Sequence, residues 1–111
     1  MTIAYADFEK IDIRVGTVIE ALPFPEARKP AIRLRIDFGA EIGVKRSSAQ
    51  LTAHYTPEGL LGRQVIAVVN FPAKQIGKTV SDCLVLGVPD PAGEPVLLIP
   101  DHLVSDGGRL F

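Results

Sequence analysis

The sequence predicts an all-β fold, a small closed barrel of short strands. Residues 31–38 alternate apolar and polar side chains, which is the pattern of a strand with one buried face. Gly16 interrupts a long apolar stretch over residues 11–22, and a glycine inside a strand indicates a bulge or a sharp bend. Residues 64–70 are rich in β-branched side chains, and helices do not alternate with strands along the chain.

A short helical insertion is expected after the third strand. Ser-Ser-Ala-Gln at residues 47–50 fits a capping box ahead of a helix over residues 51–55. Thr56 and Pro57 then predict a second helix start, with a hydroxyl cap and a proline at the first position. This order indicates an OB-fold, a five-stranded barrel that forms one domain over residues 1–111 with short terminal extensions.

The second half of the chain predicts two more strands, at residues 84–88 and 96–99, with a turn rich in breakers over residues 89–95. Between the strands at 64–70 and 84–88 lies a polar, basic segment, residues 71–81, which we expect to be a loop. A loop held between two buried strands suits a binding site on a rigid scaffold, although a purely structural loop has the same pattern.

Composition narrows the function classes. The 111 residues, 47% hydrophobic and 23% charged, are typical of one globular domain with its own core. The net charge of -1 requires any nucleic-acid site to be a local basic patch. The N-terminal residues lack the pattern of a signal peptide, and no apolar run is long enough to span a membrane, so we expect a cytoplasmic protein without membrane insertion.

The sequence offers no catalytic constellation. Cys83 is the single cysteine, which excludes an intrachain disulfide, and we expect it to be a small buried hydrophobe. His54 and His102 do not lie at metal-ligand spacing with another strong ligand. We therefore expect no enzyme activity, no metal and no cofactor.

A basic face is expected on the outside of the barrel. The third strand is expected over residues 42–47, with Ile42 and Val44 inward. Outward cations from the first three strands, the first loop at residues 23–30 and the segment 71–81 would form this face: Arg14, Arg28, Arg33, Arg35, Lys45 and Lys78. Such a face commonly binds oligonucleotides in OB-folds, but outward strand positions are polar in any barrel.

Several segments carry a resemblance to the tRNA-binding domain family. They are residues 7–16, 24–30, 36–39, 45–52, 62–65, 68–76 and 81–87, in order along almost the whole chain. Within that family, the sequence is most similar to small bacterial members described as export-related chaperones.

The resemblance implies a non-catalytic binding protein with an OB-fold that binds tRNA by its shape. Its chaperone-like members are homodimers that also bind unfolded or precursor polypeptides. By position, the implied tRNA contacts are Lys29, Ser47, Ser48, Asn70, Lys74 and Ser81. Lysine neutralises phosphate, and Asn and Ser hydrogen-bond phosphate and sugar oxygens, so such contacts read little sequence.

The two chain ends are candidates for a dimer interface. A helical turn is expected at residues 5–10, with Ala4, Phe8 and Ile11 on one apolar stripe toward the core. Four apolar or aromatic side chains mark the ends, namely Tyr5, Phe8, Leu110 and Phe111; they either form the interface or cap their own barrel. Besides the chaperone hypothesis, a tRNA-binding accessory protein for a synthetase and a structural partner in a larger assembly both fit the sequence.

Overall fold

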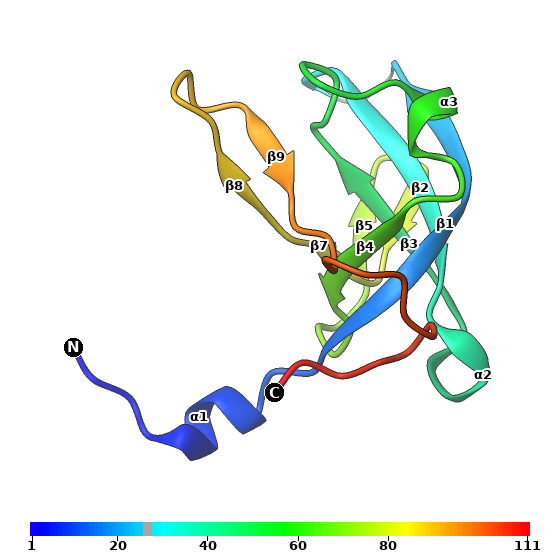
Figure 1. The fold of residues 1–111 in the computed structure, drawn as a ribbon. Helices are drawn as coiled ribbons and strands as arrows, with labels where there is room; N and C mark the ends of the chain where they lie inside the picture. The colour runs from blue at the N-terminus through cyan, green and yellow to red at the C-terminus, as the bar shows by residue number, and fades with distance from the viewer. Residues whose placement is uncertain (26–27) are drawn as a thin grey trace.

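The strand β1 (Ile13–Phe24) is shared by both sides of the barrel (Figure 1). In the computed structural model, which describes residues 1–25 and 28–111, it pairs antiparallel with β2 (Ala31–Asp37) and with β4 (Gln64–Val68). With β3 (Val44–Ala49) and β7 (Leu84–Val85), the sheet has the order β3-β2-β1-β4-β7. These five antiparallel strands form a nearly closed barrel, which confirms the all-β, OB-type fold.

The alternation along β2 sorts its side chains as predicted. Ile32, Leu34 and Ile36 are at most 1% exposed and belong to the barrel core. Arg33 and Arg35 lie on the opposite, outer face, because successive side chains of a strand point to opposite faces. Burial of the apolar residues therefore fixes the outward direction of the two arginines.

Of the two features expected at Gly16, a bulge or a sharp bend, the bulge lies elsewhere, because the register of β1 shifts between Val18 and Glu20. Gly16 has a packing role instead. A Cβ atom there would lie 2.7 Å from both Ile36 Cγ2 and Phe38 Cδ1, so only glycine lets β1 approach these core residues.

The phase predicted for β3 is also wrong. A short helix, α2 (Gly39–Ile42), includes the first residue of the strand that was expected over residues 42–47. It ends at Gly43, whose φ of 84° suits glycine and whose carbonyl accepts a hydrogen bond from Phe38 N–H at 3.0 Å. The strand β3 begins at the next residue, Val44, and the side chain of Val44 is exposed.

Pairing with β2 then decides which side each residue of β3 faces. Lys45 is opposite the core residue Ile36, and Arg46 is opposite the outward Arg35. Since paired residues share a face, Lys45 lies on the inner side, half-buried, and Arg46 lies on the outer side. The prediction that Lys45 belongs to the outer basic face is therefore wrong, and Arg46 takes its place.

The helical insertion is shorter than predicted. Ser47 is opposite Leu34 within β3 and is buried, so it cannot cap a helix, and residues 51–55 form only a turn. The second helix start is confirmed: α3 (Pro57–Leu60) is capped by the Thr56 hydroxyl, which accepts from Gly59 N–H at 3.1 Å.

Two hairpins lie outside the five-stranded sheet. The segment expected to be a loop contains β5 (Lys74–Ile76) and β6 (Thr79–Ser81), which pair around Gly77. The strand expected at residues 84–88 is divided between β7 and β8 (Gly87–Pro89). β8 pairs with β9 (Pro95–Leu97) in a hairpin that leaves the main sheet.

The N-terminal helix α1 (Tyr5–Glu9) projects away from the barrel (Figure 1). None of its residues is buried, so the apolar stripe expected to face the core is wrong. Within the described ranges, no helix has the length and apolar character needed to cross a bilayer.

The C-terminal tail continues the barrel beside β1. Val15 N–H donates to Gly108 O at 3.0 Å, Gly107 N–H donates to Val15 O at 2.8 Å, and Leu110 N–H donates to Ile13 O at 2.9 Å. The tail thereby covers the part of the β1 edge that β2 leaves unpaired.

Candidate nucleic-acid interface

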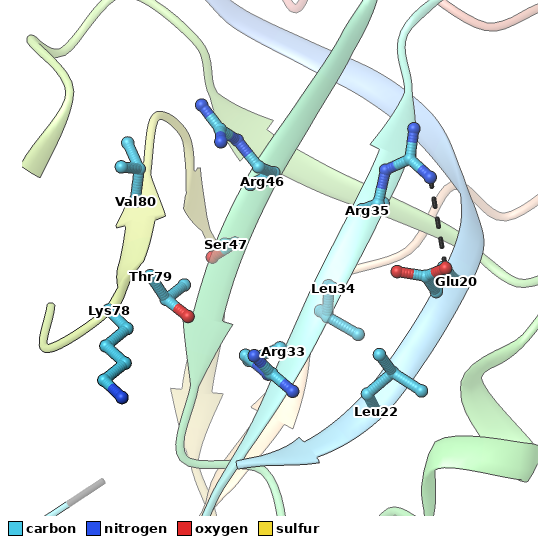
Figure 2. Close-up of a pocket in the computed structure, with 10 residues that line it drawn as sticks. All are labelled: Glu20, Leu22, Arg33, Leu34, Arg35, Arg46, Ser47, Lys78, Thr79 and Val80. Atoms are coloured by element: carbon cyan, nitrogen blue, oxygen red, sulfur yellow. Dashed lines mark ion pairs between the residues drawn. The ribbon is translucent and has the colours of Figure 1, made fainter. Parts of the chain in front are cut away.

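A groove runs over the outer face of β1, β2 and β3, with β6 as its wall (Figure 2). One part has a volume of about 210 Å³, and a second part of about 450 Å³ continues past Arg33, Lys78 and Thr79. We call the two parts together the hairpin groove. It is lined by Glu20, Leu22, Phe24, Arg28, Arg33, Leu34, Arg35, Arg46, Ser47, Ile76, Gly77, Lys78, Thr79 and Val80.

The hairpin groove collects most of the predicted basic face. Arg28, Arg33, Arg35 and Lys78 all line it, although they come from different segments of the chain. Arg46 joins them and was missed by sequence reasoning, because only the pairing register reveals its outward direction.

Charges within the groove are only partly balanced. Arg35 lies 3.9 Å from the Glu20 carboxylate, and Arg46 lies 3.2 Å from that of Asp82. Such exposed pairs are weak and screened by salt. The positive charge of the groove therefore remains available to an anion.

Arg33 occupies a special place in the groove. Its guanidinium carbon lies 5.3 Å from the centre of the Phe24 ring, a cation–π arrangement. Its Nε atom is buried and has no hydrogen-bond partner among the described residues. A buried donor without a partner costs free energy, which an acceptor from a ligand can recover after a small side-chain movement.

Arg14 does not belong to this surface. Its Nε donates to Asp12 Oδ1 at 2.6 Å and its Nη1 donates to Gly107 O at 3.0 Å, with the side chain 13% exposed. The hydrogen bond from Arg14 lowers the pKa of the Asp12 carboxyl below its usual range and raises the pKa of the guanidinium. Arg14 thus fastens the C-terminal tail to β1, and its prediction as a basic-face residue is wrong.

Asn70 makes two structural hydrogen bonds. Its Oδ1 accepts from Asp12 N–H at 3.0 Å, and its Nδ2 donates to Lys10 O at 2.8 Å. The side chain therefore clamps the segment that enters β1, a role that sequence reasoning missed. A tRNA contact by Asn70 remains a prediction and would have to use the second lone pair or the second N–H of this amide.

The three predicted serines lie in different environments. Ser47 is 3% exposed and faces the core, whereas Ser48 is half-buried on the outer face, opposite Arg33. Ser81 Oγ donates to Cys83 O at 3.2 Å. Of the three, Ser48 lies on the same face as the outward arginines.

Cys83 is buried, as the sequence predicts. Burial raises the pKa of its thiol to about 12, with a further contribution from the neighbouring Asp82 carboxylate. The thiol therefore stays protonated at neutral pH and is a poor nucleophile.

Lys74 lies beside a separate depression at the base of the β5–β6 hairpin. This depression has a volume of about 640 Å³, and we call it the apolar hollow. It is lined by Phe71, Pro72, Ala73, Lys74, Gln75, Ser81, Asp82, Cys83 and Leu84.

Lys29 is exposed in the connection between β1 and β2. Of the loop predicted at residues 23–30, Pro23 and Phe24 belong to β1. Residues 26 and 27 lie outside the part of the chain that the structure describes.

The chain ends meet at one place. Tyr5 and Phe8 from α1 and Leu110 and Phe111 from the tail line a depression of about 250 Å³, which we call the terminal cluster. Arg109 Nη2 donates to Glu9 O at 2.9 Å and holds the two ends together. The four predicted interface residues are therefore neighbours, and Tyr5 and Phe111 remain exposed.

The histidines lie away from the hairpin groove. His54 Nε2 is 2.6 Å from Asp90 Oδ2 and connects the 51–55 turn with the β8–β9 hairpin, whereas His102 is exposed in the tail. Within residues 1–25 and 28–111, no three His, Cys, Asp or Glu side chains form a group that could hold a metal ion.

Comparison with known proteins identifies the family. A family model described as "Putative tRNA binding domain" matches residues 13–109, so the chain belongs to the tRNA-binding domain family. The chain is 36% identical over 108 residues to a methionine–tRNA ligase of Porphyromonas gingivalis. That match covers 97% of this chain and 15% of the ligase, so the chain spans about a seventh of this much longer relative.

Solved structures of similar length are also found. The chaperone CsaA of Bacillus anthracis is 49% identical with a TM-score of 0.93, and the match covers 100% of both chains. The CsaA chaperone protein of Picrophilus torridus is 48% identical with a TM-score of 0.92, covering 99% of this chain and 100% of that one. The resemblance recognised in the sequence is thereby confirmed.

The bonds of Asn70 predict a loss of stability on substitution. Asn70→Ala removes both hydrogen bonds to the segment entering β1, and we expect the free energy of unfolding to fall by about 1–2 kcal/mol. Urea unfolding followed by circular dichroism measures the change. Gln50→Ala serves as control, because this exposed amide makes no side-chain hydrogen bond within the described residues; equal stability of the two variants would contradict the clamp.

Proposed function

We propose that the protein is a non-catalytic tRNA-binding protein that uses the hairpin groove. Membership of the tRNA-binding domain family supports this, together with the concentration of cations on one outer face. The observation that carries the proposal is that Arg33 and Lys78 both line the groove. The salt bridges that the structure describes there involve two other cations, Arg35 and Arg46.

Phosphate contacts explain how a protein of net charge -1 binds a polyanion. The groove gathers five cations together with the Glu20 carboxylate, whereas acidic residues such as Asp7, Glu58 and Asp101 lie on other elements. Lysine and arginine contacts release counterions from the RNA and position it with little reading of sequence. Lys29, Lys74 and Ser48 are proposed to add contacts at the margins of the groove.

A salt series tests the proposal. Lys78→Ala is expected to weaken binding of total tRNA and to make the dependence of affinity on salt shallower, by about 0.7–0.9 in the log–log slope for each phosphate that the variant no longer neutralises. Lys74→Ala is expected to act in the same direction. Fluorescence anisotropy with labelled tRNA measures both quantities.

The matched control is Lys10→Ala, because Lys10 is an exposed lysine after α1, outside the groove, and pairs with Asp7. No binding by the wild type at low salt would overturn the proposal. Equal weakening in the Lys10 and Lys78 variants would remove the groove as the site.

A second function is favoured by the apolar hollow. Phe71 and Leu84 line it and are 55% and 49% exposed, so they offer an apolar surface to a partner. The CsaA relatives are described as chaperones. We propose that the hollow binds apolar side chains of unfolded or precursor polypeptides in the cytoplasm, in connection with export.

Aggregation of an unfolded client tests the second function. Phe71→Ala is expected to reduce the suppression of citrate synthase aggregation several-fold, measured by light scattering, because it removes apolar contact area from the hollow. Leu61→Ala is the control, since Leu61 is similarly exposed, at 57%, but lies beyond α3. If the wild type suppresses no aggregation and still binds tRNA, the alternative of a tRNA-binding accessory protein for a synthetase is favoured.

The terminal cluster is proposed to be the interface of a homodimer. Tyr5 and Phe111 leave aromatic surface exposed on two segments that already contact each other, and a second copy would cover it. A symmetric pair of barrels would also present two hairpin grooves to one RNA.

Sedimentation equilibrium tests this interface. Phe111→Asp is expected to convert the dimer to a monomer, because the interface would bury an unpaired carboxylate. Leu103→Asp, in an exposed part of the same tail but outside the terminal cluster, is expected to remain dimeric. A wild-type monomer at micromolar concentration would contradict the proposal.

A further inference from the structure

The hairpin groove and the apolar hollow are connected by one ion pair, between Arg46 and Asp82. Arg46 lines the groove, and Asp82 lines the hollow. The Nη2 atom of Arg46 donates to Asp82 Oδ2 at 3.2 Å, and the backbone N–H of Arg46 donates to Asp82 Oδ1. Figure 2 shows the Arg46 side chain reaching from β3 toward the β5–β6 hairpin. A carboxylate of the hollow is therefore neutralised by a cation of the groove.

Backbone bonds hold Asp82 in the hollow independently of this guanidinium. Asp82 N–H donates to Arg46 O at 2.9 Å, and Cys83 N–H donates to the same oxygen at 3.3 Å. These bonds fix residues 82 and 83 against β3, whereas the side chain of Arg46 is 52% exposed and can turn toward a ligand. Asp82 thus stays in the hollow whichever anion the guanidinium binds.

A phosphate in the groove competes with this carboxylate for Arg46. The planar guanidinium suits phosphate as well as carboxylate. If the phosphate replaces the carboxylate, Asp82 loses its cation, and if the two anions share the guanidinium, they repel each other. Lys74 also lines the hollow, but the salt bridges of the described residues give Asp82 no cation other than Arg46. In both arrangements Asp82 is less well neutralised than in the free protein.

The neutralisation of Asp82 matters to an apolar ligand in the hollow. The Asp82 side chain is 21% exposed and shares the lining with Phe71 and Leu84. A ligand that covers this lining removes water from the carboxylate, and this costs more for an unpaired charge than for a paired one. An apolar ligand therefore binds better while Arg46 is paired with Asp82, and it strengthens that pair by excluding water.

We propose that RNA in the hairpin groove and an apolar polypeptide segment in the apolar hollow weaken each other's binding, because both act on the Arg46–Asp82 ion pair. The inference rests on the two functions proposed above and adds how one site regulates the other. Thermodynamic linkage makes the effect reciprocal, so each ligand lowers the affinity for the other by the same factor.

Two titrations by fluorescence anisotropy test the inference. The probe of the hollow is a dansyl-labelled, uncharged peptide rich in leucine and serine, whose binding Phe71→Ala is expected to weaken. The wild type is expected to bind this peptide about fivefold more weakly when saturated with total tRNA, at the low end of typical coupling because the ion pair is partly exposed. Labelled tRNA is expected to lose affinity by the same factor when the peptide is saturating.

Variants of the ion pair separate this coupling from simple steric exclusion. Asp82→Asn keeps an acceptor for Arg46 N–H but removes the charge, so tRNA is expected to leave its peptide affinity unchanged. Arg46→Gln removes the guanidinium, and its peptide affinity without tRNA is expected to equal that of the tRNA-bound wild type. Thermal unfolding confirms that each variant is folded at the assay temperature.

Glu20→Gln is the matched control. Glu20 also pairs with an arginine of the groove, Arg35, at 3.9 Å, but it does not line the hollow. Its substitution is expected to raise the affinity for tRNA, because it removes a negative charge from the groove, and to leave the fivefold coupling in place. Loss of the coupling in this variant would overturn the inference.

The remaining outcomes distinguish this inference from the proposed functions. If tRNA and peptide both bind without affecting each other, the inference fails alone. Coupling that persists in Asp82→Asn and Arg46→Gln is steric exclusion and also overturns it. If tRNA does not bind, the inference fails together with the first function, and if only the peptide does not bind, it fails together with the second.

Discussion

The pairing register of β2 and β3 is the constraint on which the candidate site depends. It places Leu34 opposite Ser47 on the inner side and Arg35 opposite Arg46 on the outer side. A slip by one residue would turn the arginines into the core and the aliphatic residues into water. Burial of the β2 aliphatic side chains therefore holds the basic groove in place.

This register sets two like charges opposite each other, which destabilises a sheet. The carboxylates of Glu20 and Asp82 only partly offset the repulsion, since both pairs are exposed. A bound phosphate would offset it better. The repulsion between the two arginines is thus consistent with a surface that is more stable with a bound anion than without one.

β1 provides the rigid support behind this surface. Gly16 lets it pack closely against β2, while the tail, fastened by Arg14, and the Asn70 clamp secure its first residues. The projecting wall of the site, the β5–β6 hairpin, is attached to this scaffold. A fixed floor with projecting walls is the usual way in which binding surfaces are built on barrels.

The sequence predicted those features that depend on local pattern. Spacing and residue type alone predict the alternation of β2, the Thr56 cap and the order of the barrel strands. They also predict that Arg28, Arg33, Arg35 and Lys78 share one face. The phase of β3 could not be predicted, because it depends on how α2 and Gly43 direct the chain.

Long-range side-chain bonds could not be predicted either. Asn70 bonds residues 58 and 60 positions away, and Arg14 bonds a carbonyl 93 positions away, so neither interaction has a local signature. The β5–β6 hairpin was hidden because its strands have only three residues each, too few to show a period.

The central claim is that RNA occupies the outer face of β1–β3 beside the hairpin. Titration of the ¹⁵N-labelled protein with tRNA, followed by amide chemical shifts, tests it most directly. The account predicts the largest changes at Arg33, Arg46 and Thr79, with little change on the β8–β9 hairpin. Changes confined to β8–β9 or to α1, with the groove unaffected, would contradict it.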